Sequence, residues 1–261
     1  MTHVDLDPNV IHLCVTPFTD LTDPALLRQY ETLLSDEERE RRGGYLFEID
    51  QRRYLVARAL LRTALSRYAP IEPRDWVFAA NEYGRPAIAQ PIGQTARLRF
   101  NISHTRRLIL LGVTADRQLG VDIEDWHARQ APLAIADHFF ALQEVRDLRA
   151  LPHVEQHRRF FEYWTLKESY IKARGKGLAI PLDRFSFRFP SPTSISLAVN
   201  PDLNDQARCW RFWQFEPMPG SVAAVCAERP GTGVPRLLLK QIIPLVEESD
   251  IEHHPMRKSL D

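Results

Sequence analysis

LGVDIED, residues 119–125, is the stretch that decides the fold, because apolar and polar side chains alternate along it as in a β-strand with one buried face. Asp122 and Glu124 are two residues apart, so both carboxylates leave the same face of the strand. Adjacent carboxylates repel one another unless a cation neutralises them. Hard oxygen ligands suit Mg²⁺, which keeps coordination positions for water and for substrate phosphates. Taken alone, a D-x-E pattern favours the simpler alternative, the solvated face of an edge strand.

On both sides of this stretch, the apolar periodicity predicts further strands and two long helices. The expected elements are strands at 97–103 and 108–114, a helix at 50–68 with Asp50 as its N-cap, a helix at 157–174 ended by Gly175 and Gly177, and strands around Phe185 to Phe189 and at 221–227. Residues 190–206 are rich in Pro, Ser, Asn and Asp and are expected to be a loop. The polar stretch 247–261 is expected to fray.

A faint internal repeat connects the two predicted helices. QRRYLVARALLR at 51–62 and HRRFFEYWTLKE at 157–168 both place Arg-Arg-aromatic at the start of a long helix. If the repeat is real, two similar halves meet near residues 115–119, with a site between them.

The second helix carries a polar stripe. Trp164, Glu168 and Lys172 are four residues apart and share one side of the helix, away from its apolar face. A third carboxylate would thus be available to Asp122 and Glu124. The alternative is a surface ion pair between Glu168 and Lys172, worth a few tenths of a kcal/mol.

Three polar segments stand out as candidates for phosphate binding. Ser103 and His104 end a predicted strand, where a hydroxyl, an imidazole and turn amides can hold a phosphate; neighbours on a strand point apart, so they are no nucleophilic dyad. Arg85 stands at the tip of a Gly-Arg-Pro turn. Arg41 and Arg53 lie in an arginine-rich region in which interspersed acids make a solvated helix face the default interpretation.

The overall composition is that of a soluble globular protein. Apolar residues make up 44% and charged residues 26% of 261, and Lys plus Arg equals Asp plus Glu at 34 each, so no broad basic field draws the chain to nucleic acid or to an acidic membrane. Three cysteines without a C-x-x-C pair fit a reducing compartment. Met1–Asp5 lacks the basic start of a signal peptide, and no apolar run is long enough to span a bilayer. We expect a cytoplasmic monomer.

Taken together, these segments resemble the Sfp-type 4'-phosphopantetheinyl transferase family. The matching words, in order, are SDEERERRGGYLFEIDQRRYLVARALLR at 35–62, EYGRP at 82–86, FNISHT at 100–105, GVDIED at 120–125 and FEYWTLKESYIKARGKGL at 161–178. The resemblance covers residues 35–190, and its specificity comes from the order and spacing of the words.

This resemblance implies an α+β fold of two similar α/β subdomains related by a pseudo-twofold axis, here 1–116 and 117–261, with the active site in the cleft between them. It implies a Mg²⁺-dependent enzyme that transfers the 4'-phosphopantetheine of coenzyme A to a serine of an apo acyl or peptidyl carrier protein of fatty acid, polyketide or non-ribosomal peptide synthesis, releasing adenosine 3',5'-bisphosphate. The implied metal ligands are Asp122, Glu124 and Glu168.

The resemblance also implies roles for the remaining candidates. Asp122, Glu168 and Lys172 would be catalytic, with Lys172 on the pyrophosphate. The implied coenzyme A contacts are Arg41, Arg53, Arg85, Ser103, His104 and Lys172, with Ser103, His104, Arg41 and Arg53 at the ribose phosphate and Arg85 where many members have Lys beside the nucleotide.

Two positions stand apart from this pattern. Glu38 replaces a lysine of some relatives, which leaves Arg39, Arg41 or Arg42 as substitutes for one phosphate contact. Glu144 resembles a family carboxylate near the site.

Two other functions remain possible from the residues. A metal-dependent nuclease would also use clustered carboxylates and a lysine, although the neutral charge argues against it. The second is a carrier- or nucleotide-binding module without activity, against which the complete set of carboxylates and Lys172 argues.

Overall fold

The computed structural model describes residues 6–91, 93–127, 130–229, 233–252 and 254–259. The segment Met1–Asp5, on which the expectation about a signal peptide rests, lies outside them.

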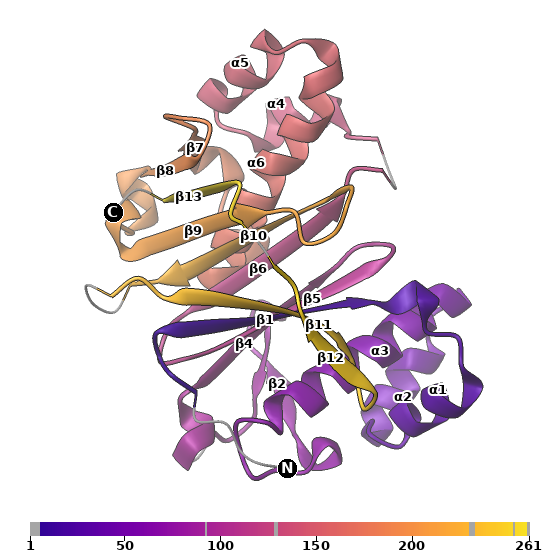
Figure 1. Ribbon diagram of the computed structural model, residues 1–261. Helices are drawn as coiled ribbons and strands as arrows, with labels where there is room; N and C mark the ends of the chain where they lie inside the picture. Colours follow the sequence, from indigo (N-terminus) through magenta and orange to yellow (C-terminus); the bar gives the residue numbers. More distant parts are fainter. Residues whose placement is uncertain (1–5, 92, 128–129, 230–232, 253, 260–261) are drawn as a thin grey trace.

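The chain has a mixed α+β fold, as predicted. Its helices gather in two groups on opposite sides of the strands (Figure 1). They are α1 (Pro24–Glu31), α2 (Asp36–Gly43), α3 (Glu48–Leu65), α4 (Ala136–Phe139), α5 (Leu142–Ala150) and α6 (His153–Ala173).

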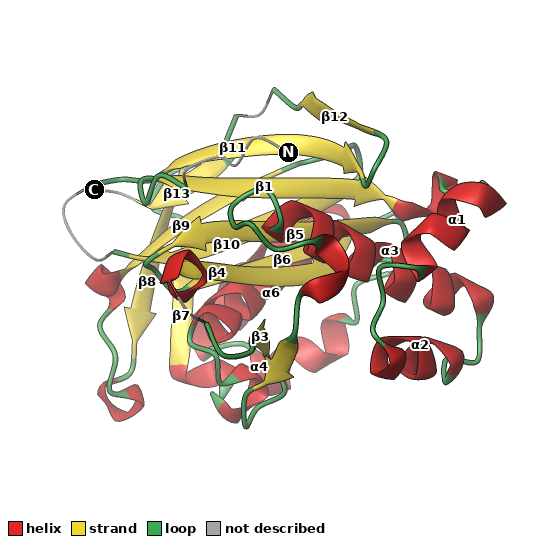
Figure 2. Cartoon of the chain, turned by 90° about the horizontal axis from the view of Figure 1, so that it is seen from below, coloured by secondary structure: helices red, strands yellow, loops and turns green. Residues whose placement is uncertain are grey.

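The strands form two large sheets and one small one (Figure 2). The five-stranded sheet has the order β12 (Glu247–Asp250), β11 (Arg236–Ile243), β1 (Val10–Pro17), β5 (Leu108–Ala115), β4 (Leu98–His104). The six-stranded sheet has the order β6 (Leu119–Asp125), β10 (Ser221–Glu228), β9 (Trp210–Phe215), β13 (Arg257–Ser259), β8 (Ser194–Val199), β7 (Phe185–Arg188). Strands β2 (Phe78–Ala80) and β3 (Pro86–Ile88) pair separately.

The apolar core explains this layering. Leu119, Val121 and Ile123 of β6 enter one cluster with apolar residues of β1, β5, β9, β10 and β11, as the alternation in LGVDIED predicts. The outer side of the five-stranded sheet is covered by α3, whose apolar face packs on β4 and β5. Helix α6 covers the outer side of the six-stranded sheet through an aromatic-rich cluster. The two long helices therefore back onto different sheets.

Three of the sequence predictions are wrong in detail. Helix α3 begins at Glu48 after Phe47, whose side chain makes no capping bond, and Asp50 instead pairs with Arg53 at 2.8 Å. The segment 190–206 contains strand β8, and the stretch 247–261 contributes strands β12 and β13. Strands β8 and β12 pair with the strands that precede them, β7 and β11, and β13 pairs with the distant β8 and β9. Strand pairing uses backbone groups, so the polar composition of these segments did not indicate it.

The division into 1–116 and 117–261, and the pseudo-twofold axis, stay predictions. Strands β11 and β12 come from the predicted second part, but they pair in the sheet of β1, β5 and β4.

Cys14, Cys209 and Cys226 are free thiols. Within the described parts of the chain, no helix has the length and apolarity needed to cross a membrane.

Candidate active site

The polar face of β6 is covered by helix α6 rather than by solvent. Asp122 is only 5% exposed, so the solvated edge strand is excluded for this residue. Gly120 explains the close approach, because a Cβ at this position would lie 2.0 Å from the carbonyl oxygen of Ser169 and 2.4 Å from the backbone nitrogen of Ala173. Only glycine lets the helix backbone rest on the strand.

A hydrogen-bonded triangle joins β4, β6 and α6 around Asp122. Lys172 Nζ donates to Asp122 Oδ1 at 2.6 Å and to Ser103 Oγ at 3.0 Å. The Ser103 hydroxyl donates to the same Asp122 Oδ1 at 2.8 Å. Among the described residues, the second carboxylate oxygen, Asp122 Oδ2, is buried and has no hydrogen-bond partner. The buried aspartate therefore keeps one oxygen for a further ligand.

Asn101 holds β4 and β6 together although these strands belong to different sheets. Its Oδ1 accepts a hydrogen bond from the backbone nitrogen of Val121 at 2.8 Å, in a buried setting. This bond brings Ser103, two residues further along β4, level with Asp122. Asn101 was not among the residues predicted from the sequence. The available signal was an asparagine inside a strand pattern, where this residue type is depleted.

Glu168 lies one turn before Lys172 on the predicted stripe, and the stripe is confirmed. Trp164, Glu168 and Lys172 are half-buried between neighbours that are buried. The pKa of Glu168 is raised from 4.5 to about 7, first by burial and then by the negative charge of Asp122, while Lys172 acts in the opposite direction. A carboxyl group that titrates near neutrality suits general base catalysis.

These side chains have donor chemistry that fits a divalent cation. Among the described residues, Asp122 has a buried oxygen without a hydrogen bond, and its negative charge raises the pKa of Glu168. Glu124 follows Asp122 at the same-face spacing and is half-buried. In the described part of the chain, however, no three acidic, histidine or cysteine side chains converge closely enough to hold a metal ion. The three predicted metal ligands are thus neighbours along two elements without forming a preassembled cage.

Positive charge flanks the triangle at the end of β4. The pKa of His104 is lowered, first by partial desolvation and then by the positive charges of Arg53 and Lys172, although the side chain reaches the surface. Arg53 is held by Asp50. The positive charges of Arg53 on α3 and Lys172 on α6 therefore both act on His104 at the end of β4. Ser103 is buried and His104 is exposed, in agreement with the expectation that they point apart.

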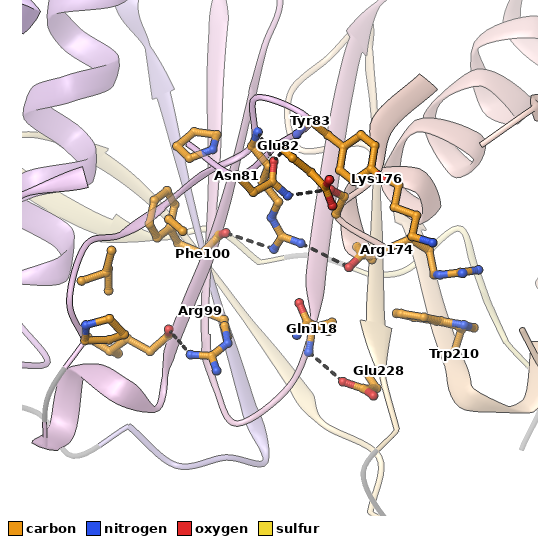
Figure 3. Close-up of a pocket in the computed structure, with 18 residues that line it drawn as sticks. Asn81, Glu82, Tyr83, Arg99, Phe100, Gln118, Arg174, Lys176, Trp210 and Glu228 are labelled. Atoms are coloured by element: carbon orange, nitrogen blue, oxygen red, sulfur yellow. Dashed lines mark hydrogen bonds between the residues drawn. The ribbon is translucent and has the colours of Figure 1, made fainter. Parts of the chain in front are cut away.

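Arg41 and Arg85, two of the predicted nucleotide contacts, lie outside the triangle of Asp122, Ser103 and Lys172. Arg41 is exposed near the end of α2, and its charge acts on Tyr54. Arg85 donates to backbone carbonyls behind the triangle, including that of Lys172 at 2.9 Å. It lines a cavity of about 600 Å³ between the 81–88 segment, β4 and the end of α6 (Figure 3).

Glu38 is the centre of a structural network. It completes a capping box with Ser35 at the start of α2 and forms ion pairs with Arg58 and Arg62 of α3. Of its proposed substitutes, Arg39 pairs with Asp36 and Arg42 with Glu31.

Glu144 is not part of the cluster around Asp122. It is fully buried and forms an ion pair of 2.7 Å with Lys167, which is also fully buried. Its contacts tie α5 and α6 together, which indicates a structural role, and a position of Glu144 near the site stays a prediction.

Comparison with known proteins covers both parts of the chain. Residues 23–115 match the N-terminal domain of 4'-phosphopantetheinyl transferases, and residues 118–227 match the 4'-phosphopantetheinyl transferase superfamily. The chain is 34% identical to the 4'-phosphopantetheinyl transferase Sfp of Bacillus subtilis (strain 168), over 77% of this chain and 85% of that protein. It is 32% identical to the 4'-phosphopantetheinyl transferase HetI of Nostoc sp., over 76% of this chain and 80% of that protein. The predicted resemblance is confirmed, and the chain belongs to the Sfp-type 4'-phosphopantetheinyl transferases.

Proposed function

We propose that this protein transfers the 4'-phosphopantetheine arm of coenzyme A to a serine of an apo acyl or peptidyl carrier protein and releases adenosine 3',5'-bisphosphate. The observation that carries the proposal is the cluster of Asp122, Ser103 and Lys172, with Glu168 beside it at a pKa of about 7. The names of the relatives, 4'-phosphopantetheinyl transferases, support the same reaction.

The transfer step uses Glu168 and Lys172. The carrier serine oxygen forms a bond to the β-phosphorus of coenzyme A, and the bond from that phosphorus to the oxygen bridging to the α-phosphate breaks. Glu168 takes the serine proton, since its raised pKa makes it a suitable acceptor near pH 7. Lys172 compensates the negative charge that develops on the departing phosphate.

Asp122, Glu124 and Glu168 would hold Mg²⁺ in this proposal. When bound there, a magnesium ion would neutralise the pyrophosphate and orient it. Lys172 already pairs with one oxygen of Asp122, which leaves the buried Oδ2 as the atom of that carboxylate without a hydrogen bond among the described residues.

His104 and Arg53 are the best-placed groups for the ribose phosphate of coenzyme A. Their charges already interact, and a phosphate between them would favour the protonated imidazole. Ser103 and Arg41 complete the proposed contacts at the same phosphate, whereas a contact of Arg85 with the nucleotide is what the family resemblance implies. Of these three, only Ser103 belongs to the hydrogen-bonded cluster.

The decisive experiment is mass spectrometry of a panel of apo acyl and peptidyl carrier proteins after incubation with the enzyme, coenzyme A and Mg²⁺. We expect one carrier or more to gain the mass of one phosphopantetheine arm, with an equal amount of adenosine bisphosphate. Omission of Mg²⁺ should abolish the gain. No mass gain across the panel would overturn the proposal.

A further inference from the structure

The guanidinium group of Arg85 donates its hydrogen bonds to backbone carbonyl oxygens. Its Nη1 donates to the carbonyl oxygens of Lys172 at 2.9 Å and Ala173 at 3.2 Å. Its Nη2 donates to the carbonyl oxygens of Leu119 at 2.9 Å and, more weakly, Phe100 at 3.5 Å. One guanidinium group therefore joins the end of α6 to the starts of β6 and β4.

The turn that carries Arg85 is built to cap α6. Asn81 Nδ2 donates to the carbonyl oxygen of Gly175 at 2.7 Å (Figure 3). Asn81 Oδ1 accepts from the backbone nitrogens of Tyr83 at 3.0 Å and Arg85 at 2.9 Å, which fixes the shape of the turn. The last carbonyls of a helix lack intrahelical partners, and a cation is favourable at that end.

We infer that Arg85 is a positioning residue for Lys172 and not a ligand of the nucleotide. The inference rests on the proposed function and departs from the role that the family resemblance implies for Arg85. Four N–H groups of the guanidinium point at four carbonyls, so a phosphate could be held in the arginine fork only after these bonds break. The desolvated setting of the side chain, which lowers its pKa, agrees with this internal role.

The position of Lys172 explains why the clamp matters for catalysis. Arg85 binds the backbone carbonyl of Lys172, and the ammonium group of the same residue binds Asp122 and Ser103. A shift of the end of α6 would move the ammonium relative to the carboxylate. Displacement by about 1 Å can lower a rate about 100-fold.

Arg99 offers a matched control, because it lines the same cavity as Arg85. Within the described residues, its Nη1 donates only to carbonyl oxygens of its own segment, those of Ala96 and Leu98, each at 2.8 Å, and the side chain makes these bonds close to the surface. Arg99→Ala therefore removes a cation from the cavity wall without removing a bond to α6.

The first test is hydrogen–deuterium exchange of the full-length chain without substrate. We expect Arg85→Ala to speed backbone exchange over residues 170–176 about tenfold, or about 1.4 kcal/mol, relative to the parent and to Arg99→Ala. Equal exchange in the three proteins would overturn the clamp. This test does not depend on the reaction, so it separates failure of the clamp from failure of the proposed function.

The second test separates positioning from nucleotide binding by steady-state kinetics of carrier modification. We expect Arg85→Ala to lower kcat about 10-fold to 100-fold, with KM for coenzyme A nearly unchanged, and to add little when Lys172 is already alanine. If Arg85→Ala is poorly folded, Arg85→Lys replaces it: one ammonium group cannot span α6, β6 and β4, so kcat should still fall. A raised KM with an unchanged kcat would show that Arg85 binds the nucleotide.

Discussion

Helix α6 carries two lysine–carboxylate pairs, whose lysines are five residues apart and which differ in exposure and in how completely they are hydrogen-bonded. Lys167 pairs with Glu144 at 2.7 Å, and Lys172 pairs with Asp122 at 2.6 Å. Both side chains of the first pair are 0% exposed, whereas the side chain of Lys172 is 25% exposed. The chemistry is the same on both sides of the helix, so the surroundings decide what each pair can do.

The first pair is fully satisfied. Lys167 also donates to the carbonyl oxygens of Leu182 at 2.7 Å and Phe185 at 2.8 Å. The Glu144 carboxylate accepts from two backbone nitrogens, each at 2.8 Å. Such a pair locks α6 against α5 and β7 and has no capacity for a ligand.

The second pair is incomplete. Two donors share Asp122 Oδ1, while Oδ2 is buried and lacks a partner among the described residues. A buried oxygen left without a hydrogen bond costs free energy that a cation can recover. We therefore assign the incomplete pair to the proposed active site and the complete pair to the scaffold.

Breaking the complete pair should have the largest effect. Glu144→Ala leaves the ammonium group of Lys167 buried without its counter-ion, so we expect the free energy of unfolding in urea to fall by about 3–5 kcal/mol. The double variant Glu144→Ala, Lys167→Met should recover part of the loss, because it removes the stranded charge. Transfer per folded molecule should stay near the parental value. A fall of less than about 1 kcal/mol would contradict the assignment of this pair to the scaffold.

Breaking the incomplete pair should impair the reaction and spare the fold. We expect Asp122→Asn to lower kcat about 10²–10³-fold, while the ligand-free variant melts no lower than the parent, since repulsion with Glu168 is relieved. The thermal stabilisation by coenzyme A with Mg²⁺ should shrink. Asp125→Asn is the matched control on the same strand, because Asp125 pairs with Arg107 instead, and it should lose stability and retain kcat. Parental turnover in Asp122→Asn would remove Asp122 from the machinery.

The proposed phosphate site beside the incomplete pair can be tested with two ligands. We expect His104→Ala and Arg53→Ala each to weaken coenzyme A binding by about 1.5–3 kcal/mol, and to weaken dephospho-coenzyme A binding much less, because that ligand lacks the ribose phosphate. Calorimetric titration measures both. Arg106→Ala, an exposed arginine in the turn after β4, should change neither affinity by a comparable amount. Equal losses for the two ligands would place the phosphate elsewhere.

The smallest expected effect is a pH dependence from Glu168. Its pKa is about 7 in the folded protein and 4.5 as its ordinary value, so the folded form holds a proton that the unfolded chain has released between these two pH values. Stability from this group is complete below about pH 4.5 and is lost as the pH rises to about 7.

We therefore expect the unfolding free energy of the parent, minus that of Glu168→Gln, to fall by about 1–3 kcal/mol between pH 4.5 and 7 in the presence of a chelator. Urea titrations at several pH values measure the difference. Added Mg²⁺ should reduce the fall, because a cation favours the ionised carboxylate. A difference independent of pH would contradict the raised pKa.

The parts of this structure that depend on periodicity could be predicted from the sequence. The alternation in LGVDIED placed Asp122 opposite the core, and the four-residue spacing on α6 placed Glu168 and Lys172 on one stripe. The contacts that assemble the site could not be predicted, because they join segments far apart in the chain. Gly120 matters only because α6 rests on it, and Asn101 only because β6 lies beside β4.

The contacts of Arg85 could not be predicted from the sequence either. Its turn is recognisable in the sequence, but the carbonyls that the guanidinium meets belong to three other elements. Strand β13 was missed for the same reason, because its partners β8 and β9 come from much earlier in the chain. Strand β12 pairs with the preceding β11 and was missed because backbone pairing does not require apolar side chains.

The pairing of β1 with β11 has a consequence for the order in which the protein can be made. Strand β1 ends at Pro17, and its parallel partner begins at Arg236. At a synthesis rate of 5–20 residues per second, roughly 10–45 seconds separate the two strands. During that time the edge of β1 that pairs with β11 has unpaired backbone groups, and such an edge is a template for pairing with another chain. The nascent polypeptide should therefore depend on holdase chaperones, and slow translation between the two strands should favour its aggregation.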